Sequence, residues 1–64
     1  MAQNNRLKAA RVLRGMTQLH LAEKIGRREI EISRIETGRC SPDPETKRRI
    51  AEALGKPVYE LFHG

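Results

Sequence analysis

The segment from Thr17 to Gly38, TQLHLAEKIGRREIEISRIETG, constrains the fold most, because it predicts two short helices joined by a tight turn at Gly26. The Thr17 hydroxyl is suited to cap the first of these helices, and Met16 can pack back on Leu21 as a hydrophobic staple. Gly26 is suited to end the same helix, because glycine adopts the left-handed backbone found at helix ends. The segment therefore predicts two helices held close together.

The second of these helices has an inner face and an outer face. Ile32 and Ile35 are three residues apart and can reach the same core. The remaining side chains turn outward, and they are Arg27, Arg28, Glu29, Ile30, Ser33 and Arg34. This outward set is the candidate binding surface of the chain.

Two helices joined by a turn that contains glycine make a helix-turn-helix, whose second helix can enter the DNA major groove, about 12 Å wide. Three segments in this order, TQLHLAEKIG, ISRIETG and IAEALGKPVYELF, resemble the Cro and phage-repressor type of helix-turn-helix domain. The resemblance runs from Leu7 to Phe62 and covers nearly the whole chain. It implies an all-α, compact, lambda-repressor-like domain of five helices that binds DNA as a small transcriptional regulator.

The N-terminal part is expected to supply the first helix. Residues 1–5 carry no periodic pattern and are expected to form a flexible tail, with Asn4 or Asn5 as a possible helix cap. The domain itself is expected to span residues 6–64. A spacing of three residues between apolar positions predicts that one stripe of the helix covers the two-helix unit; these positions are Leu7, Ala10 and Leu13.

The C-terminal part is expected to supply two more helices. Asp43 is a suitable N-cap for a helix over 44–54, followed by a short helix over 58–62. Leu61 and Phe62 are expected to join the core or partly to face a second subunit. Lys47 stands where the resembled family usually has a leucine, so the core is expected to be thinner there or covered by the lysine stem.

The charge balance favours a polyanionic partner. The 64 residues carry 13 Lys and Arg against 8 Asp and Glu, a formal net charge of +5. Cys40 is the only cysteine, so no intrachain disulfide can form, and a reducing, cytoplasmic location is expected. No apolar run approaches the roughly 20 residues of a membrane helix. We therefore expect a soluble protein that binds double-stranded DNA and no membrane.

Four outward side chains are the candidates for reading bases: Arg28, Glu29, Ile30 and Arg34. Arg28, Glu29 and Ile30 lie at the start of the second helix, the end that meets base edges in this docking geometry. Arg34 lies one helical turn beyond Ile30 and would reach deeper along the same groove or contact the flanking phosphate. Arginine can bridge guanine O6 and N7, glutamate can accept from cytosine N4, and isoleucine can meet a thymine methyl group. The alternative is a merely charged helix face with spaced ion pairs, such as one between Arg27 and Glu31.

Four other residues are the candidates for phosphate contact: Gln18, Arg27, Ser33 and Arg39. Gln18 opens the first of the two helices, where its amide and the helix N–H groups can meet a phosphate, as the matching glutamine does in the resembled family. Arg39 lies in the loop after the second helix. The alternative for Gln18 is an ordinary solvated surface residue.

The resemblance also implies a structural ion pair between Arg11 and Glu36, with two separately solvated charges as the alternative. Nothing in the sequence suggests an enzyme, a metal site, a cofactor or a small-molecule ligand. We expect a repressor that acts as a homodimer on a palindromic operator, with residues 28–36 in the major groove. The competing hypothesis is a protein-interaction module, antitoxin-like or an adaptor, built on the same fold.

Overall fold

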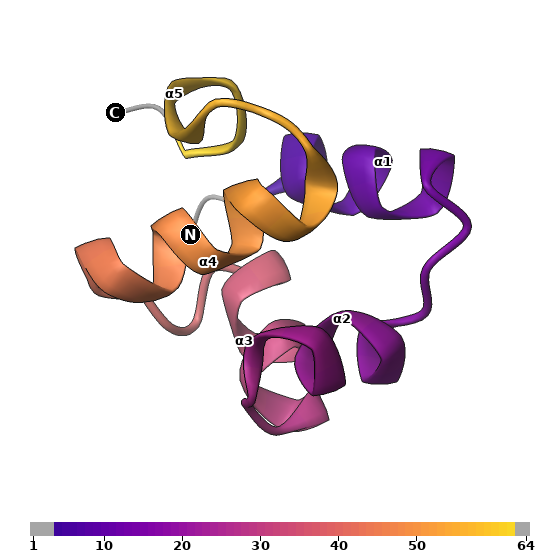
Figure 1. Ribbon diagram of the computed structural model, residues 1–64. Helices are drawn as coiled ribbons and strands as arrows, with labels where there is room; N and C mark the ends of the chain where they lie inside the picture. Colours follow the sequence, from indigo (N-terminus) through magenta and orange to yellow (C-terminus); the bar gives the residue numbers. More distant parts are fainter. Residues whose placement is uncertain (1–3, 63–64) are drawn as a thin grey trace.

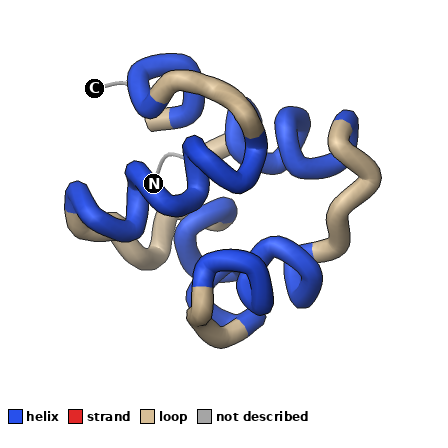
Figure 2. Tube along the Cα trace, in the orientation of Figure 1, coloured by secondary structure: helices blue, strands red, loops and turns tan. Residues whose placement is uncertain are grey.

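Residues 4–62 are the part of the chain that this computed structural model describes, and they contain five helices joined by loops and no strand (Figure 2). The helices are α1 (Asn5–Leu13), α2 (Gln18–Ile25), α3 (Glu29–Glu36), α4 (Pro44–Leu54) and α5 (Val58–Leu61). The described residues occupy 25 × 22 × 21 Å. The predicted all-α class with five helices is confirmed.

One hydrophobic core lies between all five helices. In Figure 1, α2 and α3 form the lower part of the molecule, α4 crosses its middle, and α1 and α5 lie above. The largest fully buried side chains come from the first four helices and are Leu7, Leu21, Ile32, Ile50 and Leu54. Leu61 of α5, 2% exposed, closes the core, so this residue does not face a second subunit. Each such side chain stabilises the fold by about 1.5–3 kcal/mol.

The apolar stripe predicted for α1 is wrong at its C-terminal end. Leu7 and Ala10 are buried, but Leu13 is 83% exposed. Successive residues turn by about 100° around a helix, so two steps of three residues carry a side chain about 120° away from the starting face. Arg11, four residues after Leu7, occupies the inner face instead and is buried.

The N-terminal boundary lies earlier than expected, because Asn4 and Asn5 belong to the folded domain. Asn4 caps α1, its side-chain oxygen accepting from the Leu7 N–H at 2.9 Å. The Asn4 side-chain amide donates to the Leu61 carbonyl at 2.8 Å, and its backbone N–H donates to the Glu36 carbonyl at 2.8 Å. One residue thus joins α1 to the ends of α3 and α5. The rest of the expected tail, residues 1–3, lies outside the described residues.

Lys47 covers the edge of the core with its stem. The residue is half-buried, and its Nζ lies 5.7 Å from the centre of the Phe62 ring. A cation at this distance from an aromatic face is attracted to the ring. The lysine therefore stands at the place of the expected leucine with its charged end over the Phe62 ring.

The start of α4 carries a charged cap. The Asp43 side chain accepts from the Thr46 N–H at 2.8 Å, and Pro44 follows at the first helical position. Hydrogen bonds from the Thr46 side chain and backbone hold the pKa of Asp43 below its ordinary value. Because the ionised form is the better acceptor, folding and ionisation of Asp43 favour each other.

Substitution Asp43→Asn tests this coupling, because asparagine also caps helices but does not titrate. The stabilisation from ionised Asp43 is fully present above its unfolded-state pKa of about 3.9 and is lost as the pH falls toward the lower folded-state value. We expect the stability difference between the parent and the variant to be constant near neutral pH and to shrink in acid. Urea unfolding of both proteins across this range measures it. Parallel pH profiles would contradict the coupling.

Candidate nucleic-acid interface

The turn between α2 and α3 sets the two helices against each other. Gly26 has a φ of 72°, and the N–H of Arg27 donates to the carbonyl of Ala22 at 2.9 Å, which closes the end of α2. Ile32 and Ile35 of α3 are buried in the core. Since these two residues fix the inner face of α3, the opposite face must look outward.

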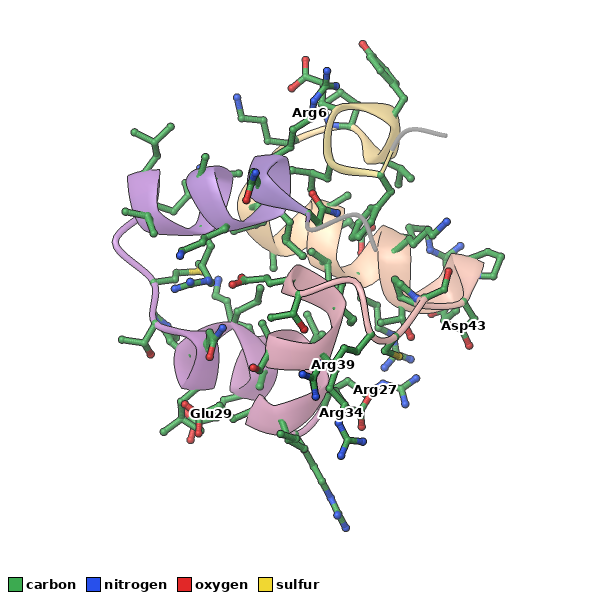
Figure 3. All side chains as sticks on the ribbon, turned by 180° about the vertical axis from the view of Figure 1, so that it is seen from behind. Arg6, Arg27, Glu29, Arg34, Arg39 and Asp43 are labelled. Carbon is green, nitrogen blue, oxygen red and sulfur yellow. The ribbon has the colours of Figure 1, made fainter. Side chains whose placement is uncertain are left out.

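The four candidate base-reading residues are all exposed: Arg28, Glu29, Ile30 and Arg34. Ile30 and Arg34 lie opposite the buried Ile32 and Ile35, whereas Figure 3 shows Glu29 on the side of α3 that faces α2. Ile30 is 50% exposed and makes no part of the hydrophobic core. Within residues 4–62, no ion pair involves Arg28, Glu29 or Arg34. The outer face thus carries charges that the rest of the described chain does not neutralise.

The N-terminus of α3 differs from the starts of the other long helices. Asn4, Thr17 and Asp43 cap α1, α2 and α4 with their side chains, whereas Arg28 occupies the cap position of α3 and makes no side-chain cap hydrogen bond. An uncapped helix start of this kind costs about 1 kcal/mol. Glu29 in the first turn offsets part of this cost through the helix dipole. The first turn of α3 therefore keeps backbone N–H groups open to a partner.

The loop after α3 folds back over the end of the helix. Gly38 has a φ of 81°, and the N–H of Arg39 donates to the carbonyl of Arg34 at 2.8 Å. This backward bond is the one that closes a Schellman motif. In the view of Figure 3, Arg34 and Arg39 lie on the side of α3 away from Glu29, and Arg6 lies at the far end of the molecule beside α5. The backbone bond between Arg39 and Arg34 thus places both arginines at the C-terminal end of α3.

Arg27 is partly engaged within the chain. Its Nη2 donates to the hydroxyl of Thr46 at 3.1 Å, and its Nη1 lies 3.9 Å from Oε2 of Glu31. The long ion pair corresponds to the alternative of a charged helix face, and it is confined to this one residue of the set. Sequence reasoning missed Thr46. Its spacing of four from Ile50 could have placed it on the inner face of α4.

A buried ion pair connects α1 to the end of α3. The Arg11 Nε lies 2.7 Å from Oε2 of Glu36, and the two side chains are 9% and 5% exposed. Arg11 also donates from Nη2 to Oε1 of Glu36 at 3.2 Å and from Nη1 to the carbonyl of Met16 at 2.7 Å. Among the described residues, no buried side-chain polar atom lacks a hydrogen-bond partner.

Gln18 and Ser33, two candidates for phosphate contact, are half-buried. The Nε2 of Gln18 donates to Oε1 of Glu36 at 3.0 Å. The link between Gln18 and the buried ion pair was not anticipated from the sequence. Of the two arginines among the phosphate candidates, Arg27 is partly engaged as described above, and Arg39 is exposed.

Over residues 4–62, no group of three or more His, Cys, Asp and Glu side chains is placed to hold a metal ion. No helix in this range is long and apolar enough to cross a membrane. Cys40 is a free thiol exposed at the surface.

Comparison with known proteins identifies the class of this fold. A family model described as helix-turn-helix matches residues 7–61. The chain therefore belongs to the Cro and phage-repressor type of helix-turn-helix proteins, a family of DNA-binding transcription regulators.

A solved structure gives a more particular comparison. The chain is similar to PlcR of Bacillus thuringiensis, whose crystal structure was determined in complex with the peptide PapR7 and DNA. The two share 37% sequence identity with a TM-score of 0.81, over 98% of this chain and 24% of that chain. The present chain thus spans only a minor part of the length of PlcR. No curated protein matches the sequence.

Proposed function

We propose that this chain binds double-stranded DNA in a sequence-specific manner through the outer face of α3. The observation that carries the proposal is the exposed, unneutralised set Arg28, Glu29, Ile30 and Arg34 on a helix whose opposite face is locked into the core. A major groove about 12 Å wide admits such a helix. The solved complex of the similar PlcR with DNA supports the same use of the fold.

The chemistry of the four side chains assigns their roles. Arg28 and Arg34 donate to guanine O6 and N7, Glu29 accepts from cytosine N4, and Ile30 packs on a thymine methyl group. The Glu29 carboxylate is repelled by phosphate groups, so a position at the base edges suits it better than one at the DNA backbone. The exposed apolar surface of Ile30 is then covered by the groove.

The phosphate contacts flank this helix on both sides. Gln18 and the start of α2 contact the DNA backbone before the turn, and Arg39 contacts it after α3, with Arg27 and Ser33 between them. These contacts position the domain and carry little sequence information. Because neutralisation of phosphates supplies much of the affinity, binding weakens steeply as the salt concentration rises.

The regulator acts as a repressor and as a homodimer on a palindromic operator, inside the cytoplasm. A dimer places two copies of α3 one helical turn of DNA apart, about 34 Å, so that each reads one half-site. A bound dimer then blocks the DNA by its bulk.

Selection of bound duplexes from a random pool, at two salt concentrations, tests this function. We expect an enriched inverted repeat whose half-sites lie about 10 base pairs apart, with weaker binding at the higher salt. An enriched single half-site would contradict the dimer alone. No enrichment, together with tight and salt-insensitive binding to a protein, would favour the protein-interaction module instead.

A further inference from the structure

We infer that Glu36 positions the Gln18 amide for its contact with a DNA phosphate, and that the buried Arg11 makes this carboxylate available. The inference rests on the proposed DNA binding and assigns a binding role to a residue pair that otherwise only joins helices. The structural basis is a chain of hydrogen bonds that runs from Arg11 through Glu36 to Gln18.

The three side chains come from three different helices and meet at one place. Gln18 is the first residue of α2, Glu36 is the last residue of α3, and Arg11 lies on the inner face of α1. Oε2 of Glu36 lies 2.7 Å from Nε of Arg11, and Oε1 accepts from Nε2 of Gln18 at 3.0 Å. Gln18 therefore sits at the edge of a buried network and at the exposed start of α2.

The carboxylate determines which end of the Gln18 amide turns inward. An ionised carboxylate only accepts hydrogen bonds, so it binds the amide nitrogen and not the amide oxygen. The amide nitrogen carries two hydrogens, and the contact with Glu36 uses one of them. The second hydrogen remains for another acceptor beside the N–H groups that open α2, where a phosphate oxygen would lie. In the flipped orientation the amide oxygen could not donate to a phosphate.

The charge at position 36 would be unfavourable without Arg11. A carboxylate at the end of α3 meets the negative end of the helix dipole, and its burial removes it from water. A glutamine at this position would avoid both costs, but its amide could present either an oxygen or a nitrogen to Gln18. Glu36 is therefore suited to orient the Gln18 amide, and Arg11 supplies the opposite charge that compensates for its burial.

A double-mutant cycle on the duplex selected above tests the inference. Binding is measured at one fixed salt concentration for the parent, Gln18→Ala, Glu36→Gln and the double variant. We expect Gln18→Ala to weaken binding about tenfold in the parent, the loss of one charge-assisted hydrogen bond. The same change should weaken binding less than about threefold in the Glu36→Gln background, because the amide there is no longer oriented. A purely structural Glu36 would leave the effect of Gln18→Ala the same in both backgrounds.

Arg39→Ala is the matched control, because Arg39 lies in the loop after α3 and makes no hydrogen bond or ion pair with Glu36. This substitution should lower the DNA affinity by the same factor in both backgrounds. If Glu36→Gln does not fold, the double variant Arg11→Met and Glu36→Leu replaces it, since buried ion pairs commonly tolerate apolar replacement of both partners. Equal effects of Gln18→Ala in both backgrounds, or none in the parent, would overturn the positioning role while DNA binding stands. A parent that selects no DNA would overturn both.

Discussion

Substitution Arg11→Ala is expected to lower the free energy of unfolding by about 3–5 kcal/mol, because it leaves the buried Glu36 carboxylate without its counter-charge. The remaining partner, Gln18, is neutral and supplies a single hydrogen bond. Small domains unfold at a cost of only about 5–15 kcal/mol, so this loss brings the variant close to unfolding at room temperature. Urea denaturation followed by far-ultraviolet circular dichroism measures the change.

The matched control removes both charges together. The double variant Arg11→Met and Glu36→Leu leaves no uncompensated charge, and we expect it to be within about 1–2 kcal/mol of the parent or more stable. A loss below about 1 kcal/mol for Arg11→Ala alone would contradict the buried pair, since that is the range of exposed ion pairs. The pair would then be solvated in solution.

Substitution Arg28→Ala is expected to cost about 1–3 kcal/mol of binding free energy at one base position of the selected site and to relax the preference there. Arg28 is exposed at the start of α3 and has no ion-pair partner among residues 4–62, so its removal should leave the fold intact. Binding of the variant to the selected duplex and to its single-base variants measures the effect.

Arg39→Ala supplies the comparison for Arg28→Ala. Because Arg39 is expected to contact a phosphate, its removal should lower the affinity by the same factor on every duplex. The slope of log affinity against log salt concentration should become shallower by about 1. Equal losses of affinity on all duplexes after Arg28→Ala would contradict base reading by Arg28. They would indicate that Arg28, like Arg39, contacts the DNA phosphate backbone.

The fold could be predicted largely because its signals are local. Thr17, Gly26 and Asp43 mark helix ends through their own backbone and side-chain chemistry, and the structure has helix ends at all three. Leu13 could not be placed by the same rule, because a spacing of three drifts around the helix and only the position of α1 on the core decides which side is covered. Asn4 was likewise predicted only as a cap, since its contact with Leu61 joins opposite ends of the sequence.

The candidate site could be predicted in composition but not in its internal contacts. The outward set on α3 follows from the burial of Ile32 and Ile35, which periodicity indicates. The hydrogen bonds of Gln18 with Glu36 and of Arg27 with Thr46 depend on side-chain orientations across two helices, and no spacing rule encodes them. These contacts decide which polar groups remain free for DNA.

Contact between α3 and the bases is tested most directly by intermolecular nuclear Overhauser effects in the complex with the selected duplex. The Ile30 methyl groups should show effects to major-groove base protons, including a thymine methyl group. The Leu13 methyl groups, 83% exposed on α1, should show none and serve as the internal control. Effects from Leu13 to the DNA, with none from Ile30 in a saturated complex, would show that another face binds DNA and would contradict base reading by α3.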